Sequence, residues 1–170
     1  MKLEQLIRDI PDFPKQGILF KDITTLLKDP TAFRQSIDQL TELVRGMAPA
    51  LVIGMESRGF IFAAPIAYRL NAGFVPVRKL GKLPGEVISA EYDLEYGTNT
   101  LELHRDAIAS GDKVLIVDDL LATGGTVSAT IELVERLHGK VVAVAFLVEL
   151  TALKGRDRLQ DQNVISLLKF

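Results

Sequence analysis

Apolar residues along this chain of 170 residues form two kinds of pattern, which together predict alternating strands and helices. Uninterrupted apolar runs that are rich in β-branched residues indicate strands buried on both faces. They lie at residues 50–55, 114–117 and 141–150, and shorter stretches at 74–78 and 163–168 predict two further strands. Apolar side chains at helical spacing indicate helices at residues 29–47, 60–70 and 127–138. Because strands alternate with helices, we expect an α/β fold whose parallel sheet is covered by helices on both faces.

Two segments depart from this alternation. Near the start, residues 2–9 predict a short helix that the following prolines should end, and residues 15–27 predict a loop with an apolar centre. Asp29 and Pro30 suit the N-cap and the first position of the next helix. Residues 79–104 mix charged residues with glycines and end in an alternating stretch, so we expect a flap of antiparallel strands that lies outside the core sheet.

The composition favours a single globular domain over residues 1–170, because 48% of the residues are hydrophobic and 25% are charged. A net charge of −2 gives no reason to expect binding to nucleic acid or to an anionic membrane. The sequence contains no Cys, which excludes disulfides, thiolate catalysis and zinc–thiolate sites. The first ten residues lack the apolar core of a signal peptide, and the longest apolar run is too short to span a membrane. We therefore expect a cytoplasmic enzyme or binding protein.

The clearest chemical signal follows the apolar run at residues 114–117. Asp118 and Asp119 stand where we expect that strand to end, and a loop of small residues then leads into the helix predicted at 127–138. Glycines let backbone N–H groups approach an anion at a helix N-terminus, and carboxylates suit sugar hydroxyls or a divalent metal. The sequence therefore predicts a site for a phosphorylated sugar. The loop consists of Ala122, Thr123, Gly124, Gly125 and Thr126.

This stretch resembles the phosphoribosyl-pyrophosphate (PRPP) motif of the type I phosphoribosyltransferases. Four further stretches resemble bacterial-type adenine phosphoribosyltransferases, and the resemblance extends from residue 6 to residue 168. They are F-P-K-Q-G-I-L-F-K-D-I at residues 13–23, E-S-R-G-F at 56–60, R-K-L-G-K-L-P-G at 78–85 and L-E-Y-G at 94–97. The family also carries V-E-L-T-x-L-K-G-R, which occurs here at residues 148–156.

The resemblance implies a role for each of these stretches. The 5′-phosphate and ribose of PRPP would be held by Ala122, Thr123, Gly124, Gly125 and Thr126, with Asp118 and Asp119 on the ribose hydroxyls. The pyrophosphate would be held by Glu56, Ser57, Arg58, Arg78, Lys79 and Lys82. Glu95 corresponds to the residue that acts as general acid near the purine.

The base would be bound by a segment at about residues 10–28. Phe20 would stack on adenine while the backbone of Leu19 and Lys21 reads its edge. Packing of Leu19 and Phe20 in the core is the alternative. Many members of the family carry Arg where Lys21 stands, so a bidentate role for this side chain is in doubt.

The implied reaction converts adenine and PRPP to AMP and pyrophosphate, a step of purine salvage. The resemblance further implies Mg²⁺, carried mainly by PRPP near Asp118 and Asp119, and a homodimer. One alternative is transfer to another purine, xanthine or guanine, which the segments at 13–23 and 94–97 disfavour. The other is a non-catalytic PRPP sensor that regulates transcription. Neither an added pair of DNA-binding helices nor a basic patch is evident in the sequence to support it.

Overall fold

The computed structural model describes residues 2–94 and 97–170. Its strands are β1 (Arg8–Pro11), β2 (Leu19–Asp22), β3 (Leu51–Met55), β4 (Gly73–Lys79), β5 (Val87–Asp93), β6 (Thr98–His104), β7 (Lys113–Leu121), β8 (Lys140–Glu149) and β9 (Val164–Lys169). Its α-helices are α1 (Thr24–Leu27), α2 (Pro30–Arg45), α3 (Arg58–Leu70) and α4 (Gly125–Arg136). Short 3₁₀ helices are η1 (Leu3–Leu6), η2 (Thr151–Leu153) and η3 (Gly155–Leu159).

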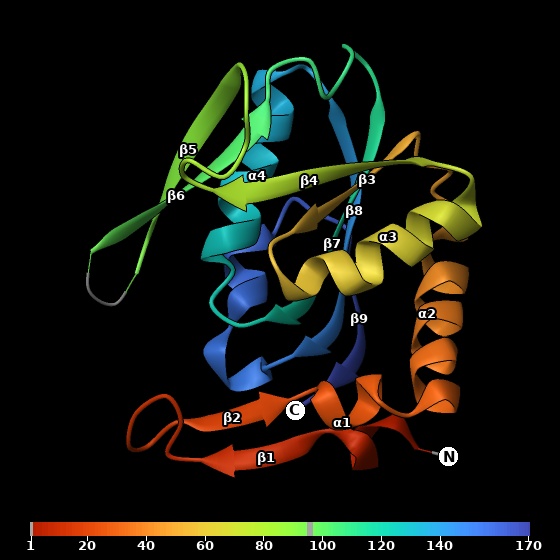
Figure 1. The fold of residues 1–170 in the computed structure, drawn as a ribbon, viewed down its shortest axis with the longest axis vertical. Coiled ribbons are helices and arrows are strands. Elements are labelled where there is room, and N and C mark those ends of the chain that lie inside the picture. Colours follow the sequence, from red (N-terminus) through yellow and green to blue (C-terminus); the bar gives the residue numbers. More distant parts are fainter. Residues whose placement is uncertain (1, 95–96) are drawn as a thin grey trace.

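Within the described residues, seven strands form one sheet in the order β5-β6-β4-β3-β7-β8-β9 (Figure 1). Within this order, the neighbouring strands β4-β3-β7-β8-β9 are all parallel to one another. Parallel neighbours need a crossover segment between them, which α3 supplies between β3 and β4 and α4 supplies between β7 and β8. The α/β fold with a mainly parallel sheet is therefore confirmed. None of the helices described is both long and apolar enough to cross a membrane.

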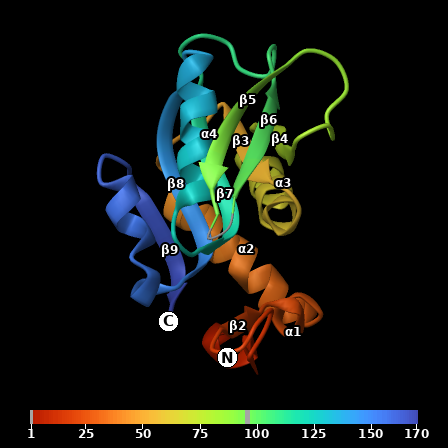
Figure 2. The ribbon, with the colours of Figure 1, turned by 90° about the vertical axis from the view of Figure 1, so that its left-hand side faces the viewer.

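The sheet separates two buried cores. Along β7, Leu115 and Val117 pack with residues of α2 and α3, whereas Val114 and Ile116 pack with residues of α4, β5 and β6. This division follows from the alternation of side chains along a strand. Figure 2 shows α4 and α3 on opposite sides of the sheet. Helices therefore cover both faces, as the sequence predicts.

The start of α2 also agrees with the sequence. The Asp29 side chain accepts hydrogen bonds from the backbone N–H groups of Thr31 and Ala32, each at 2.9 Å, and Pro30 occupies the first turn. These bonds satisfy two N–H groups that a helix leaves unpaired at its N-terminus.

The prediction of a short helix within residues 2–9 holds only for the 3₁₀ helix η1, and the prediction of a loop at residues 15–27 is wrong. Residues 2–9 contain only η1 before β1 begins, and the predicted loop at 15–27 contains β2 and α1. The antiparallel pairing of β1 with β2 overrides the local helical pattern. In this pairing Asp22 of β2 lies opposite Arg8 of β1. Its carboxylate accepts from Arg8 Nε at 3.0 Å and from the N–H of Thr24 at 2.9 Å, and these bonds lower the pKa of Asp22 to about 2.

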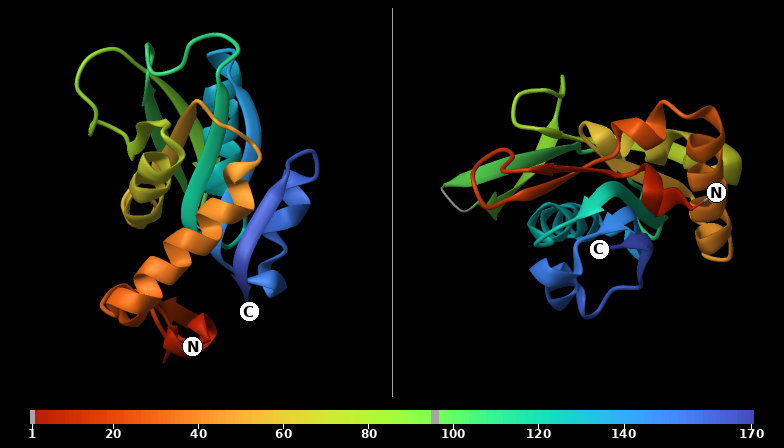
Figure 3. Two further views of the ribbon diagram at one scale, coloured as in Figure 1. Left: turned by 90° about the vertical axis from the view of Figure 1, so that its right-hand side faces the viewer. Right: turned by 90° about the horizontal axis from the view of Figure 1, so that it is seen from below.

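The flap is antiparallel, as predicted, but it does not lie outside the core sheet. β5 pairs with β6, and β6 pairs with the end of β4 through Arg78↔Glu102 and Lys79↔Leu101. Leu101 and Leu103 are buried against α4, so apolar burial holds this hairpin to the sheet. In Figures 1 and 3 the β1–β2 hairpin and the β5–β6 hairpin extend to the same side of the molecule.

The central strand β7 is longer than the sequence predicts. β7 does not stop before Asp118 but continues to Leu121, because Leu120 and Leu121 pair with Val148 and Glu149 of β8. The two aspartates therefore lie within a strand. The following helix also begins earlier than predicted, so that Gly125 and Thr126 belong to its first turn.

Candidate active site

The register between β3 and β7 brings two predicted loops together. Their parallel pairing ends at Gly54↔Val117, after which β3 turns into α3 while β7 continues through the aspartates. A cleft of about 390 Å³ opens at this edge. It is lined by Glu56, Ser57, Arg58, Lys79, Tyr92, Leu101, Asp118, Asp119, Leu120, Ala122 and Thr126. The turn that follows β3 and the last residues of β7 thus lie at one cleft.

The first turn of α3 packs directly against β7. A Cβ atom on Gly59 would lie 2.7 Å from Asp118 Oδ1 and 3.3 Å from the carbonyl oxygen of Val117. Contacts this short leave no room for a side chain at Gly59. The glycine therefore sets the distance between the turn that carries Arg58 and the acidic pair.

The acidic pair is strongly constrained by its surroundings. Asp119 is buried, and its Oδ2 lies 2.6 Å from Arg58 Nε in an ion pair. Asp118 Oδ1 accepts the backbone N–H of Asp119 at 2.9 Å. Burial raises the pKa of the Asp118 carboxyl, and the neighbouring charge of Asp119 raises it further. Arg58 therefore partly compensates two carboxylates that repel each other.

The predicted phosphate loop surrounds a hollow of about 70 Å³ at the N-terminus of α4. Gly124 is the N-cap of this helix and has φ of 86°, a left-handed conformation that favours glycine. The free N–H groups of a first helical turn attract anions. Asp118, Leu120, Ala122 and Thr126 line both this hollow and the larger cleft, so the two adjoin.

The residues predicted to hold pyrophosphate separate into two groups. Ser57, Arg58 and Lys79 line the cleft together with Glu56. The carboxylate of Glu56 is occupied, because it accepts the N–H of Lys79 at 2.5 Å and lies 3.5 Å from Arg78 Nε. Arg78 and Lys82 are not among the residues that line the described cleft. Arg78 Nη1 instead donates to the carbonyl of Lys82 at 3.5 Å.

The predicted base segment lies close to one residue that lines the cleft. Arg58 Cζ lies 5.6 Å from the centre of the Phe20 ring. Leu19 is 49% exposed, which disfavours the alternative that it packs in the core. Lys21 Nζ lies 2.6 Å from Asp9 Oδ1 and 4.3 Å from the centre of the Phe170 ring. The charge of Lys21 is therefore engaged within the protein.

Glu95, the predicted general acid, lies outside the described residues.

Tyr92 lines the cleft, although the sequence analysis did not predict it as a site residue. Its ring lies next to Gly125, because a Cβ atom on Gly125 would lie 3.6 Å from Tyr92 Cδ2. Its alternation with Ile88 and Ala90, which pack in the core around α4, is the signal that could have placed it.

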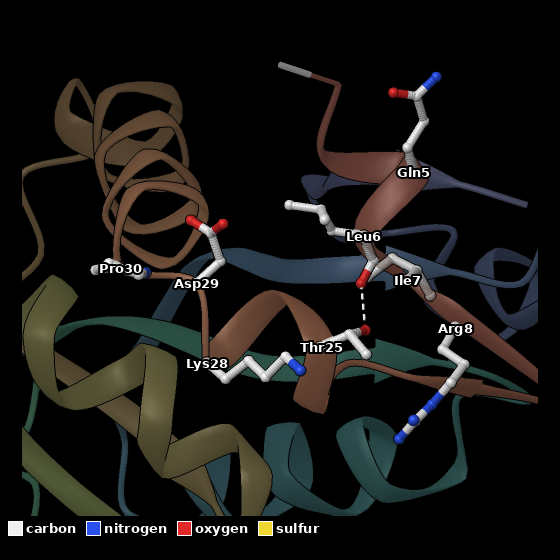
Figure 4. Close-up of a pocket in the computed structure, with 8 residues that line it drawn as sticks. All are labelled: Gln5, Leu6, Ile7, Arg8, Thr25, Lys28, Asp29 and Pro30. Carbon is white, nitrogen blue, oxygen red and sulfur yellow. Dashed lines mark hydrogen bonds between the residues drawn. The ribbon is translucent and has the colours of Figure 1, made fainter.

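A separate hollow of about 450 Å³ lies between the N-terminal segment and the start of α2 (Figure 4). Two of its polar side chains have partners within the protein, since the Thr25 hydroxyl donates to the carbonyl of Leu6 and Arg8 pairs with Asp22. None of the predicted site residues is among those that line it in the described structure. They are Gln5, Leu6, Ile7, Arg8, Thr25, Lys28, Asp29 and Pro30.

The parallel core, the paired aspartates and the glycine-capped helix define a phosphoribosyltransferase, and residues 22–169 match the model of the phosphoribosyl transferase domain. The chain is 58% identical to the adenine phosphoribosyltransferase of Carboxydothermus hydrogenoformans, with all of both chains covered. The crystal structure of that enzyme from Thermoanaerobacter pseudethanolicus aligns with a TM-score of 0.96 at 56% identity, covering 99% of this chain and all of the other. The chain belongs to the adenine phosphoribosyltransferase family.

A structure of the Saccharomyces cerevisiae enzyme is also similar, with a TM-score of 0.91 and 42% identity over 97% of this chain and 96% of the other. That crystal contains adenine together with an imino-altritol bisphosphate.

Substituting Gly59→Ala tests the contact between α3 and β7. The added methyl group would press on Asp118 and displace the turn that carries Arg58. A misplacement of about 1 Å can cost about 10²-fold in an enzyme, so we expect kcat/KM for PRPP to fall by about tenfold or more. The matched control is Gly46→Ala, because a Cβ there meets nothing within 4 Å. Equal kcat/KM values for the two variants would contradict the role assigned to this contact.

Proposed function

We propose that the protein transfers the 5-phosphoribosyl group of PRPP to adenine, which gives AMP and pyrophosphate. The observation that carries this proposal is the shared cleft, in which a cationic turn and a glycine-capped helix flank two aspartates. PRPP carries phosphate at both ends of a ribose, and this order of groups matches it. Family membership at 58% identity over the whole chain supports the same reaction.

Each part of PRPP has a proposed partner in the cleft. The loop of Ala122, Thr123, Gly124, Gly125 and Thr126 binds the 5′-phosphate through backbone N–H groups and hydroxyls. Asp118 and Asp119 accept hydrogen bonds from the ribose hydroxyls. The turn of Glu56, Ser57 and Arg58 binds pyrophosphate together with Lys79, and Arg78 and Lys82 add positive charge on the same side. The carboxylate of Glu56 anchors this turn to the backbone of Lys79.

The reaction breaks the bond between ribose C1 and the pyrophosphate oxygen, and adenine N9 forms the new bond at C1. Negative charge grows on the leaving pyrophosphate, where Arg58 and Lys79 stabilise it. Positive charge grows on the ribose beside the aspartates. Glu95 donates its proton to adenine N7 as N9 attacks. The proton that N9 carried leaves with the pyrophosphate, and the N7 proton returns to Glu95 once the N9–C1 bond has formed. Phe20 stacks on the base, and the backbone of Leu19 and Lys21 binds its edge.

Mg²⁺ fits this site as an ion that is bound mainly by the phosphate groups of PRPP. No cluster of three or more metal-binding side chains occurs among residues 2–94 and 97–170, and Asp119 is already paired with Arg58. Mg²⁺ commonly uses one or two carboxylates together with substrate phosphates and water. Asp118 and Asp119 could supply such a carboxylate. When bound, the ion neutralises charge on the pyrophosphate.

The family resemblance also implies a homodimer, and exposed apolar side chains support it. Tyr68 on α3 is 87% exposed, Phe74 on β4 is 39% exposed, and Leu80 just beyond β4 is 64% exposed. Exposed apolar residues on adjoining elements are typical of interaction surfaces. We propose that two copies meet there, and that the protein acts in the cytoplasm.

The proposal predicts a strong preference for adenine. Adenine offers an amino donor beside a ring acceptor, whereas hypoxanthine offers the reverse pattern. β2 pairs with no strand other than β1 in the described structure, so its second edge can present backbone N–H and C=O groups to the base. Sites built on such hydrogen bonds reject a mismatched analogue by about 10⁴-fold. We expect that ratio in kcat/KM between adenine and hypoxanthine.

The test is an absorbance assay with PRPP, Mg²⁺ and adenine, hypoxanthine, guanine or xanthine in turn. Phe20→Ala should weaken adenine binding without relaxing the preference. Comparable turnover of another purine would favour a phosphoribosyltransferase for xanthine or guanine, the first alternative. Tight PRPP binding without any turnover would favour the PRPP sensor.

Glu95→Gln tests the general acid separately. The substitution keeps the size of the side chain and removes the acid, and general acid–base catalysis contributes about 10²–10⁴-fold. We expect kcat to fall within that range while the Kd for PRPP changes little. Glu91→Gln is the matched control, because Glu91 is an exposed residue of β5. Turnover of Glu95→Gln equal to that of this control at every pH would show that Glu95 takes no part in the chemistry.

A further inference from the structure

The segment around Gly155 packs against the phosphate loop but takes no part in the reaction scheme. A Cβ atom on Gly155 would lie 2.4 Å from the carbonyl oxygen of Ala122 and 2.8 Å from Leu121 Cδ1. In return, a Cβ atom on Gly124 would lie 2.8 Å from the carbonyl oxygen of Gly155. The two backbones are thus in direct contact, with space for a side chain on neither glycine.

This contact lies outside the hollow that the loop surrounds. Gly155 and Arg158 do not line the hollow, although Arg158 Cβ lies 3.5 Å from the Cβ position of Gly124. Leu159, at the end of η3, is buried in the core beside α4. The segment therefore supports the loop from behind and leaves the inner side to a ligand.

An ion pair fixes the supporting segment to the sheet. Arg156 Nε donates to Glu149 Oε1 at 2.7 Å, and Arg156 Nη2 donates to Glu149 Oε2 at 2.8 Å. Arg156 Nη1 also donates to the carbonyl of Val164 at 3.0 Å. Two parallel bonds between a guanidinium and a carboxylate fix both orientation and distance. Arg156 directly follows Gly155, so its position fixes that of the glycine.

Glu149 connects this ion pair to the strand that leads into the loop. It is buried at the end of β8 and lies opposite Leu121, the last residue of β7. The hydrogen bonds from Arg156 lower the pKa of Glu149, so the carboxylate stays ionised at neutral pH. The chain of contacts thus runs from β8 through Arg156 and Gly155 to Ala122.

We propose that Gly155 and the Glu149–Arg156 ion pair are positioning residues that hold the phosphate loop in its anion-binding form before the ligand arrives. An ordered loop binds more tightly because its N–H groups need not be arranged at the moment of binding. This inference rests on the proposed function, since the 5′-phosphate is the ligand of that loop. It also gives a role to the V-E-L-T-x-L-K-G-R motif.

The test compares the binding of AMP and of pyrophosphate, by calorimetry, to the full-length protein and its variants. In Gly155→Ala the methyl group pushes on Ala122, so we expect AMP to bind about tenfold more weakly or worse. Pyrophosphate, which is held by the other turn, should bind within about twofold of wild type. KM for PRPP should rise while kcat at saturating PRPP stays within about twofold, because the chemistry takes place at other groups.

Gly139→Ala is the matched control. A Cβ atom there would lie 2.9 Å from both Ile108 Cγ2 and Val134 Cγ1, so the protein should lose stability. Gly139 precedes β8, at the end of the strand opposite to Glu149, and its variant should bind AMP like wild type. An equal loss of AMP affinity in both variants would reduce the effect to general destabilisation and overturn the proposal.

Arg156→Lys provides a second variant that keeps the charge and removes the paired hydrogen bonds. It should weaken AMP binding less than Arg156→Met does, again without changing pyrophosphate binding. Wild-type AMP affinity in both Gly155→Ala and Arg156→Lys would overturn the inference and leave the proposed function standing. A wild-type protein that does not bind AMP would instead overturn the proposed function itself, and this inference with it.

Discussion

The site depends on the unequal lengths of two neighbouring parallel strands. β3 ends at Met55, whereas β7 continues to Leu121, so the turn after β3 lies beside residues that are still held in a strand. Gly59 makes this possible, because a Cβ atom there would lie 2.7 Å from Asp118 Oδ1. Ligands bind at the carboxyl ends of strands in such sheets. Here that edge supplies a cationic turn and an anion-binding helix N-terminus within one cleft.

The charges in this cleft are arranged for a ligand that carries both phosphate and hydroxyl groups. Arg58 lies 2.6 Å from Asp119, and burial together with Asp119 raises the pKa of Asp118. A guanidinium placed between a carboxylate and an arriving phosphate lowers the cost of keeping the aspartates charged. The cation also reaches Phe20 on the β1–β2 hairpin, so the base segment and the acidic pair share one side chain.

Features that depend on neighbouring residues could be predicted from the sequence, and features that depend on distant pairing could not. The Asp29 cap and the glycine loop before α4 follow from adjacent residues, and both are present. β1 and the full length of β7 depend on partners far along the chain, namely Asp22 and Val148, which no local pattern reveals. For the same reason the attachment of β6 to β4 could not be predicted.

A crystal structure of the protein with AMP and pyrophosphate tests the central claim most directly, namely that the two strand ends hold the two ends of one substrate. The account predicts the 5′-phosphate within hydrogen-bonding distance of the backbone N–H groups of Ala122–Thr126. It also predicts pyrophosphate on Ser57 and Arg58, and ribose hydroxyls on Asp118 and Asp119. A nucleotide phosphate bound away from the α4 N-terminus, or pyrophosphate bound away from Arg58, would contradict it.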